Sequence, residues 1–333
     1  MANISEEWLE KATSEGHINY IEYNQFTDPI LIGVGGFGKV FKCEWSGNES
    51  TVVLKCLKID TSIDERTIKD FINELKLLRK VCYHPNVISF YGITKDNDGY
   101  YNMVLQYANE GTLREYLMTN FMKLQWADKL CIAIEIALGL LFLHDNNIIH
   151  MDLHAESILI HQRQPKITDF GLSKQITEMS MTSYSIVHGM PGYIDPKCFI
   201  NPKYKRDKKS DVYSFGLILW EISSGRPPFQ TFELENSLIN HILQGNRERP
   251  IEGTPSQYIE LYEKCWDNDP ANRPETSVIL NTLKHIQSLR KEAHECFKQR
   301  KFLKALELFE GIYKYSHSPE DQINASIWDL SSI

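Results

Sequence analysis

The sequence contains no closely spaced pair of cysteines. Its 7 cysteines are odd in number, lie far apart along 333 residues and never form a Cys-x-x-Cys motif. Zinc modules depend on such close spacing, and disulfide frameworks in secreted chains use even numbers of cysteines. We therefore exclude a zinc module and a disulfide scaffold, and we expect the protein to occupy a reducing compartment.

Long hydrophobic runs are also missing. The longest apolar stretch, Cys131 to Leu143, is too short to span a bilayer and carries Glu135 in its middle. Residues 1–17 are acidic and polar, whereas a secretory signal peptide starts with a basic region followed by an apolar run. We expect a soluble, intracellular, cytoplasmic protein that does not insert into a membrane.

The sequence has no excess of basic residues. Lysine and arginine number 36 against 44 aspartates and glutamates, which gives a formal charge of −8. A general nucleic-acid binder needs a basic surface to neutralise phosphates, so we do not expect nucleic acid as a partner. Hydrophobic residues make up 42% of a chain that is long enough to bury a large core.

Hydrophobic periodicity divides the chain into a strand-rich part and a helical part. An apolar stripe with helical spacing predicts one helix, Glu65–Cys82, among the strands. After Gly111 the pattern is mostly helical as far as Leu289. This order predicts an α+β fold with two adjoining lobes. The predicted strands are Ile30–Gly33, Lys39–Trp45, Thr51–Ile59, Val87–Thr94 and Tyr101–Gln106.

A Gly-x-Gly-x-x-Gly motif occupies Gly33, Gly35 and Gly38. Glycine has no Cβ, so its backbone can approach phosphate oxygens closely. The motif alone is equally typical of a plain hairpin turn. In a dinucleotide-binding fold a helix should follow it, but here the strand-like run 39–43 follows. This context favours a strand–loop–strand flap over nucleotide phosphates.

Lys55 interrupts an apolar, strand-like run over residues 52–57. Such a lysine is commonly an edge residue whose amine reaches solvent. Glu74 favours a different interpretation, because it shares the apolar face of the predicted helix and has no cation one turn downstream. A carboxylate on that face must find a cation elsewhere in the protein.

Two acidic motifs occur in the helical part, His150-Met151-Asp152-Leu153 and Asp169-Phe170-Gly171. A lone Asp-Phe-Gly is typical of an ordinary turn. In this order, after the glycine-rich loop, Lys55 and Glu74, the motifs match the signature set of protein kinases. Residues from about Phe26 to about Leu289 resemble a complete protein kinase domain, most similar to the tyrosine-kinase-like group. The segments that most resemble that group are Tyr107–Leu113, Pro191–Pro196 and Ser210–Gly216.

The resemblance implies an antiparallel small lobe with one helix, a larger helical lobe, and ATP in the cleft between them. Gly33, Gly35 and Gly38 would cover the phosphates of ATP. The backbone groups of Gln106 and Ala108, in a hinge over residues 106–111, would hold the adenine. The side chains that would enclose the adenine are Val40, Val53 and Leu159, with Leu105 as gatekeeper.

The resemblance also implies the catalytic residues Lys55, Glu74 and Asp152. Lys55 would contact the α- and β-phosphates and pair with Glu74, while Asp152 would accept the proton of the attacking hydroxyl. Asp169 and Ser157 would hold Mg²⁺, with Mn²⁺ as an alternative. These residue types suit phosphoryl transfer, which depends on positioning and charge neutralisation more than on covalent chemistry.

The loop around Asp152 departs from the kinase pattern. Ser157 replaces an asparagine that binds the second Mg²⁺, and Met151 replaces an arginine that reads activation-loop phosphate. Control by a phosphate–arginine pair at position 151 is therefore lost. His154 replaces a lysine of serine/threonine kinases, and Met190 replaces a threonine that bridges to the catalytic aspartate.

A further departure concerns the segment Asp195-Pro196-Lys197. In the family this segment ends in a glutamate that pairs with an arginine, here Arg273. Lys197 would repel Arg273, and an unpaired buried arginine costs of order ~3–5 kcal/mol. We therefore expect this loop to pack differently from the family pattern.

Two polar segments lie on either side of residues 195–197 in the sequence. Hydroxyl residues are dense between Gly171 and Pro191, which is where kinases are phosphorylated, although such density is often mere solvation. The basic run Lys203–Lys209 is typical of a solvated loop, with docking of acidic partners or phosphorylated segments as the alternative.

These observations predict an ATP-dependent protein kinase that phosphorylates protein serine or threonine, with tyrosine as an alternative acceptor. The altered catalytic loop predicts weak activity. A pseudokinase, acting as a nucleotide-binding scaffold or signalling switch, is the alternative. A kinase-shaped adaptor that acts through its C-terminal helices is a third interpretation.

The resemblance to kinases, with a change in composition near Ser288–Lys291, divides the chain into an N-terminal extension (1–23), a kinase domain (24–289) and a helical C-terminal extension (290–333). Within the domain, the small lobe covers 24–105, the hinge 106–111 and the large lobe 112–289. In the extension Ala293, Phe302, Ala305 and Phe309 resemble part of one tetratricopeptide-like helix pair. A single repeat cannot bury its own faces, so it would pack on the kinase lobe or on a protein partner. A plain amphipathic appendage is the alternative.

Overall fold

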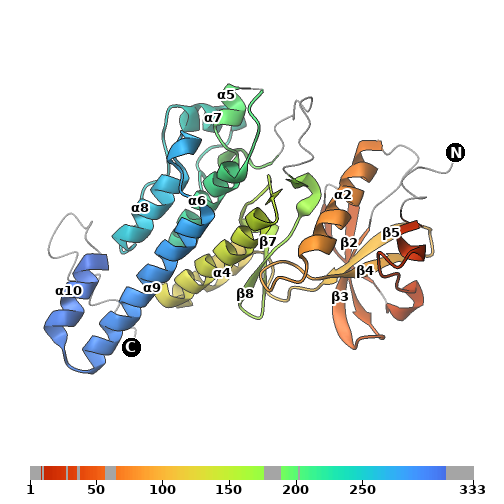
Figure 1. The fold of residues 1–333 in the computed structure, drawn as a ribbon, viewed down its shortest axis with the longest axis horizontal. Coiled ribbons are helices and arrows are strands. Elements are labelled where there is room, and N and C mark those ends of the chain that lie inside the picture. The colour runs from red at the N-terminus through yellow and green to blue at the C-terminus, as the bar shows by residue number, and fades with distance from the viewer. Residues whose placement is uncertain are drawn as a thin grey trace.

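A computed structural model of the chain describes residues 9, 11–27, 29–35, 38–56, 65–175, 189–201 and 203–312. In Figure 1 these residues form a strand-rich small lobe at one end and a helical large lobe at the other. The chain passes from one lobe to the other between residues 106 and 113. The predicted two-lobed α+β fold is confirmed.

A five-stranded antiparallel sheet forms the small lobe, in the order β1-β2-β3-β5-β4. Side chains alternate along β3, so Val52 and Leu54 are buried in the sheet core while Lys55 lies on the opposite face. Lys55 is in register with Val40 of β2 and Met103 of β5. The strands are β1 (Ile30–Gly35), β2 (Gly38–Trp45), β3 (Ser50–Cys56), β4 (Phe90–Lys95) and β5 (Tyr101–Gln106).

Helix α2 (Glu65–Val81) lies beside this sheet and confirms the helix predicted from periodicity. Phe71, Leu75 and Leu78 are buried on its inner face. Glu74 lies among them and retains only 1% of its surface. The same spacing that builds the apolar stripe therefore carries a carboxylate into the interior.

Strand β4 begins at Phe90, whereas the sequence predicts a strand from Val87. The Val87 N–H donates to the carbonyl of His84 in a turn, and Val87 forms a parallel bridge with Ile167 of the large lobe. Residues 87–89 therefore connect the lobes instead of extending the sheet. The predicted continuation of β3 to Ile59 lies outside the described residues.

Helices α4 (Trp126–Asp145) and α6 (Lys208–Ser224) build the core of the large lobe. Both are apolar on nearly all sides, as expected for helices surrounded by protein. Two short antiparallel ladders accompany them, β6 (Ile148–Ile149) with β9 (Lys174–Gln175) and β7 (Ile158–His161) with β8 (Gln164–Ile167). The large lobe also contains α3 (Leu113–Asn120), α5 (Lys197–Ile200), α7 (Glu235–Leu243) and α8 (Ser256–Cys265).

Helices α9 (Thr276–Lys298) and α10 (Phe302–Ile312) form a hairpin at the far end of the large lobe (Figure 1). Helix α9 runs without interruption through residues 289 and 290. Ala293 of α9 and Phe309 of α10 have no exposed surface and pack together. The Ser256 hydroxyl donates to the Ile312 carbonyl at 2.8 Å, so α10 is also attached to α8.

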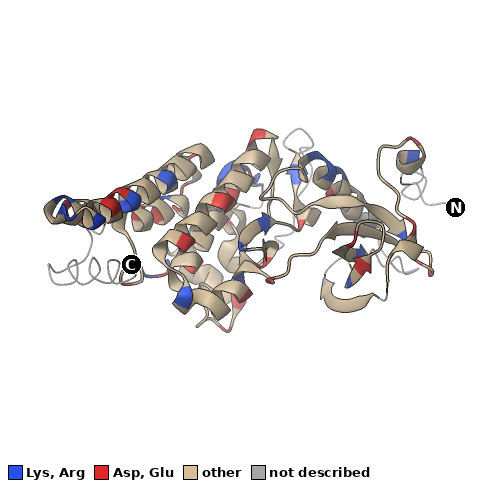
Figure 2. Ribbon diagram, turned by 90° about the horizontal axis from the view of Figure 1, so that it is seen from below, with Lys and Arg blue, Asp and Glu red and all other residues tan. Residues whose placement is uncertain are grey.

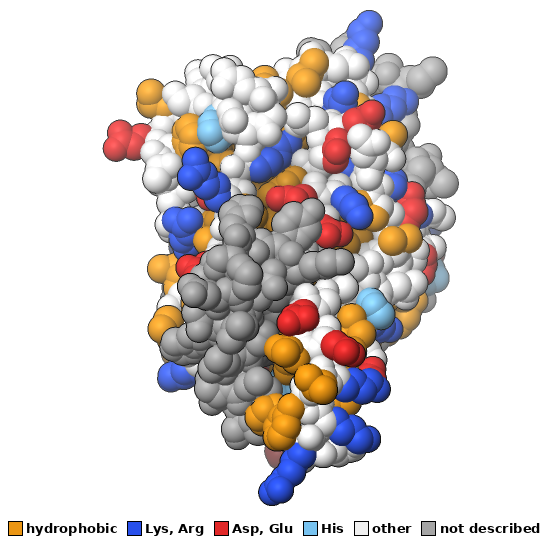
Figure 3. Space-filling model, turned by 90° about the vertical axis from the view of Figure 1, so that its left-hand side faces the viewer, with side chains coloured by type: hydrophobic (Ala, Val, Ile, Leu, Met, Phe, Trp, Pro, Cys, Tyr) orange, Lys and Arg blue, Asp and Glu red, His pale blue; other side chains and the backbone are white. Residues whose placement is uncertain are grey.

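The outer side of α10 remains apolar and exposed. Phe302, Leu303 and Leu306 keep 55%, 80% and 40% of their surface. Hydrophobic side chains gather at the lower end of the face shown in Figure 3, which is the end of the large lobe. The predicted positions therefore differ in role, since Ala293, Ala305 and Phe309 are core while Phe302 faces outward.

Acidic and basic residues are interspersed along the ribbon of both lobes, as Figure 2 shows. No helix within the described residues is long and apolar enough to cross a membrane.

Candidate active site

A cavity of about 1070 Å³ lies between the two lobes. On the side of the small lobe it is lined by the hairpin of β1 and β2 and by β3. On the side of the large lobe it is lined by the loop that follows β6. Most of the predicted site residues face this cavity. They are Gly33, Gly38, Val40, Val53, Lys55, Gln106, Ala108, Asp152, Leu159 and Asp169.

The Lys55 ammonium joins carboxylates from both lobes. Its Nζ lies 2.7 Å from Glu74 Oε1 and 3.3 Å from Asp169 Oδ1. Burial lowers the pKa of Lys55, but Glu74 and Asp169 outweigh burial and raise that pKa above its ordinary value. Lys55 is therefore a fixed cation at the inner end of the cavity.

Asp169 projects into the cavity from an uncommon backbone conformation. Its φ and ψ are both 62°, in the left-handed region, and the following Phe170 is completely buried. The ring of His150 packs on Phe170, and its Nε2 lies 2.8 Å from the Thr168 carbonyl. Buried neighbours on each side therefore stabilise the strained residue, while 49% of the Asp169 side chain stays exposed.

The loop that carries Asp152 is anchored by Asp211 at the start of α6. The two oxygens of Asp211 accept the backbone N–H groups of His150 and Met151 at 2.8 and 2.9 Å. His144 Nε2 lies 3.0 Å from the same carboxylate. Met151 has a φ of 67°, a conformation that two hydrogen bonds to one buried carboxylate can hold.

Asp152 faces the cavity beside His154, whose Nε2 lies 3.7 Å from Asp152 Oδ1. Burial raises the pKa of Asp152, but the proximity and charge of His154, with smaller effects of His150 and Arg206, hold that pKa below its ordinary value. Gly189 passes so close that a Cβ there would lie 2.7 Å from Asp152 Oδ1. The carboxylate is therefore ionised and confined near neutral pH.

Ser157 does not line the cavity. Its side chain has no exposed surface, and its hydroxyl donates to the His154 carbonyl and accepts the His154 N–H, each at 3.0 Å. The Ser157 N–H in turn donates to His154 Nδ1 at 3.1 Å. This capping arrangement fixes the tautomer of a neutral His154, because Nδ1 accepts and Nε2 must carry the proton toward Asp152.

Three further predicted residues differ in how they relate to the cavity. Glu74 reaches the site through Lys55, from behind the cavity wall. Gly35 ends β1 in register with Gly38, and its backbone alone is described. The Gln106 N–H donates to the Ser89 carbonyl at 2.9 Å within the small lobe.

A buried cation held by two carboxylates, an ionised aspartate opposite it and a glycine hairpin above are the elements of one known family. The family model for protein tyrosine and serine/threonine kinases matches residues 29–283. The chain belongs to the protein kinase family.

Curated relatives of this kinase domain support the assignment. The domain is 33% identical over 271 residues to the serine/threonine-protein kinase VIK of Arabidopsis thaliana, covering 79% of this chain and 60% of that protein. It is 31% identical over 272 residues to the probable serine/threonine-protein kinase drkD of Dictyostelium discoideum, covering 80% and 20%. It is 30% identical to the dual specificity protein kinase shkA of the same organism, covering 80% and 50%. The chain thus spans 60% or less of these relatives.

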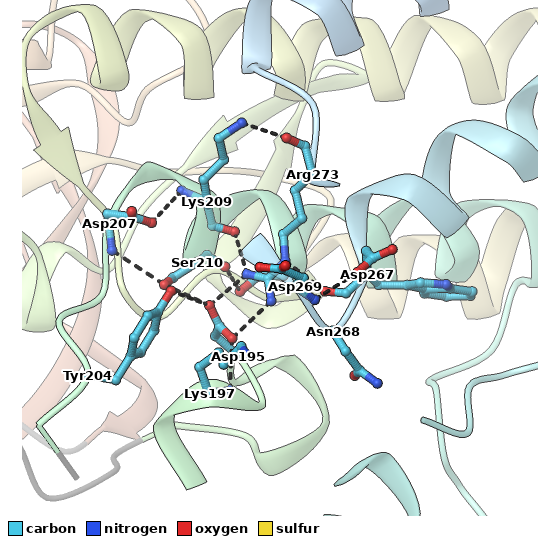
Figure 4. Close-up of polar contacts among 12 residues, drawn as sticks. Asp195, Lys197, Tyr204, Asp207, Lys209, Ser210, Asp267, Asn268, Asp269 and Arg273 are labelled. Atoms are coloured by element: carbon cyan, nitrogen blue, oxygen red, sulfur yellow. Dashed lines mark hydrogen bonds and ion pairs between the residues drawn. The ribbon is translucent and has the colours of Figure 1, made fainter. Parts of the chain in front are cut away.

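The expected repulsion between Lys197 and Arg273 of the kinase domain is wrong. Arg273 is completely buried, and Asp195 binds it with both oxygens, at 2.6 Å to Nη1 and 3.0 Å to Nη2 (Figure 4). The Lys197 N–H donates to Asp195 Oδ1, so Asp195 lies in the turn just before α5 with its carboxylate turned inward. The carboxylate partner is present, two residues earlier than the family pattern predicts.

Sequence reasoning missed Arg114 of α3. Its guanidinium donates to Glu156 at 2.6 Å, to Glu221 of α6 at 2.9 Å and to the Tyr193 hydroxyl at 2.9 Å. Tyr193 in turn donates to Glu221. These partners lie between 42 and 107 positions from Arg114, so no local pattern could indicate the network.

Proposed function

We propose that this chain transfers the γ-phosphate of ATP to protein serine or threonine hydroxyls. The observation that carries the proposal is the set of charged groups in one cavity, Lys55, Asp169 and the ionised Asp152, with Lys55 paired from behind to the buried Glu74. Phosphoryl transfer needs such charges in fixed positions more than it needs a nucleophilic side chain.

The nucleotide would bind beneath the β1–β2 hairpin. Val40, Val53 and Leu159 supply the apolar walls that an adenine ring requires. Gln106 and Ala108 supply backbone polar groups at the rim, and Gly33 leaves open space, since a Cβ there would approach only Val40, at 4.0 Å. Lys55 would hold phosphate oxygens at the inner end.

Asp169 fits a divalent cation, and Ser157 does not. The Asp169 carboxylate faces the cavity and is half exposed, so it can accept Mg²⁺ or Mn²⁺, which prefer carboxylate oxygens. The Ser157 hydroxyl is buried and already engaged with His154. No cluster of three His, Cys, Asp or Glu side chains within the described residues forms a complete metal site. A bound Mg²⁺ would neutralise phosphate charge.

Asp152 is the group that would receive the proton of the attacking hydroxyl. Its low pKa keeps it ionised, and His154 and Gly189 restrict its orientation. Arg114 would act as a positioning residue, because it ties Glu156 in the loop after Asp152 to Tyr193. Loss of these contacts would misalign the acceptor without touching the nucleotide.

Two of the relatives are named serine/threonine-protein kinases, which favours serine and threonine as acceptors, and the dual-specificity relative keeps tyrosine as a second acceptor class. Phosphoamino-acid analysis of a protein labelled by the chain tests this point. We expect phosphoserine or phosphothreonine. Nucleotide binding without any phosphoamino acid would instead indicate the pseudokinase function.

We propose residues 24–289 as the catalytic unit, residues 1–23 and 290–333 as extensions, and the cytoplasm as the site of action. All 7 cysteines are free, which suits a reducing compartment. The exposed Phe302, Leu303 and Leu306 suggest that the C-terminal hairpin contacts a protein partner. Leu303→Glu should abolish that contact and leave the rate of phosphate transfer unchanged.

A further inference from the structure

The outer side of helix α10 carries an apolar patch formed by Phe302, Leu303 and Leu306. Leu303 keeps 80% of its surface, and the other two keep 55% and 40%. Ala305 and Phe309, on the inner side of the same helix, are buried, so the hairpin of α9 and α10 leaves this α10 patch facing solvent. Neighbouring apolar side chains that stay exposed commonly mark a contact surface.

Charges of opposite sign lie at the two ends of the α10 patch. Lys298, Arg300 and Lys301 precede it, at the end of α9 and in the turn that follows. Glu307 and Glu310 follow it, in the second half of α10. All five residues are exposed. On the end face in Figure 3, apolar side chains accordingly lie between acidic side chains above and basic side chains below.

These five charges have no counter-charge in the hairpin itself. Lys304 Nζ lies 2.8 Å from Glu292 Oε1, and this ion pair ties α10 to α9. No ion pair within the described part of the chain involves the basic residues before the patch or the two glutamates after it. Single exposed charges are ordinary, but their separation by sign gives the patch a direction that a complementary surface must match.

We propose that the α10 patch binds the α10 patch of a second copy of this chain, with the two helices antiparallel across a two-fold axis. This inference rests on the proposed role of the C-terminal hairpin as a partner surface and names the partner. Placing Leu303 against Leu306 of the second copy brings the basic turn of each copy, around Lys301, beside Glu310 of the other. A parallel arrangement would instead place like charges together.

The order of the charges favours a second copy over other occupants. A two-fold contact uses one patch twice, so a patch that is basic at one end and acidic at the other is complementary to itself. An anionic lipid surface or an acidic peptide would match the basic turn, but it would be repelled by Glu307 and Glu310.

The size and place of the patch define what kind of dimer can form. Helix α10 has 11 residues and is about 16 Å long, so the contact is small and the dimer should be reversible. The hairpin lies at the end of the large lobe, away from the cavity between the lobes (Figure 1). Both cavities of the dimer would therefore remain open to nucleotide.

Sedimentation equilibrium of the full-length chain over a series of concentrations, without nucleotide, tests the dimer. We expect a monomer–dimer equilibrium in the wild type and at least about tenfold weaker association in Leu303→Glu. Met122→Glu is the matched control, because Met122 is a 94% exposed apolar residue elsewhere in the large lobe, and it should change nothing. Thermal melting checks that each variant is folded. A monomeric wild type, or a dimer that Leu303→Glu leaves intact, would overturn the proposal.

Charge reversal tests the antiparallel pairing. Lys301→Glu and Glu310→Lys each place like charges at both ends of the contact, so each variant alone should associate about tenfold more weakly. A mixture of the two should form a heterodimer with near wild-type affinity, because one copy is then acidic at both ends and the other basic. A mixture that associates no better than either variant would overturn the pairing. The measurement uses no ATP, so a failure here is distinct from a failure of phosphate transfer.

Discussion

Lys55 Nζ lies 2.7 Å from Glu74 Oε1, and this ion pair joins the sheet of the small lobe to helix α2. Glu74 keeps 1% of its surface and Lys55 12%, so neither charge is screened by bulk solvent. A buried ion pair of this kind contributes little net stability, because the cost of removing both charges from water offsets their attraction. Its position at the inner end of the cavity indicates a role in binding phosphate.

Lys55→Met should reduce phosphate transfer by at least about 100-fold, because it removes a fixed cation from the site of developing charge. It also leaves the Glu74 carboxylate buried without a cation, so the melting temperature should fall. Initial rates and thermal denaturation measure the two effects. Lys39→Met, an exposed lysine of β2, is the control and should change neither. A Lys55→Met variant with the wild-type rate would exclude the proposed role.

Asp195→Asn should destabilise the fold by about 3–5 kcal/mol at pH 7, because Arg273 would lose its buried counter-charge. Burial raises the pKa of Asp195, but Arg273 and the Lys197 N–H outweigh it and lower that pKa. The contribution is therefore complete above the unfolded pKa of about 4 and is lost as the pH falls through the lower, folded pKa.

Urea unfolding of wild type and Asp195→Asn at pH 7 and at successively lower pH measures this dependence. The two stabilities should converge below about pH 4. Asp98→Asn, a change at an exposed carboxylate, should match the wild type throughout. A constant difference between wild type and Asp195→Asn across the pH range would contradict the assigned ion pair.

Ser157→Ala should leave the concentration of Mg²⁺ needed for half-maximal rate unchanged within about twofold, because the hydroxyl does not face the cavity. It should lower stability by about 1–3 kcal/mol, since the His154 N–H loses its acceptor in the interior. A Mg²⁺ titration of the rate and a urea unfolding curve separate these outcomes. A large rise in the Mg²⁺ requirement would show that Ser157 is a metal ligand.

Arg114→Met should raise the KM for the protein acceptor and leave the KM for ATP unchanged. The reason is that Arg114 contacts Glu156 and Tyr193, through which we propose that it positions the acceptor, and no residue of the adenine pocket. Glu221, with 1% exposure, would keep the Tyr193 hydroxyl but lose its cation, so stability should also fall. Adding Glu221→Leu should recover part of that stability without restoring the acceptor KM. Equal changes in both KM values would contradict a positioning role.

Local patterns predicted those parts of the site that depend on local backbone geometry. The apolar run around Lys55 indicated a strand, which β3 forms, and helical spacing placed Glu74 on the buried face of α2. The glycine motif followed by a strand indicated a hairpin, which β1 and β2 form. In each case residues within one or two turns decide where the side chain points.

Contacts between segments that are distant along the chain could not be predicted from local sequence patterns. Asp195 and Arg273 are 78 positions apart, and which carboxylate reaches the arginine depends on the turn that starts α5. Ser157 has a suitable donor for a metal, yet its orientation follows from hydrogen bonds to His154 that a motif does not specify. Arg206 appeared as one of several basic residues in a polar loop, whereas the fold buries it against Met151.

Intact-mass analysis after incubation with Mg·ATP tests the central claim most directly. The full-length chain is compared with Asp152→Ala, which removes the proposed proton acceptor at the surface of the cavity. We expect stepwise additions of about 80 Da in the wild type and their loss in Asp152→Ala, because ionised Asp152 is required to align and deprotonate the hydroxyl. An unchanged mass in the wild type, with melting still raised by ATP, would contradict phosphate transfer and indicate a nucleotide-binding pseudokinase.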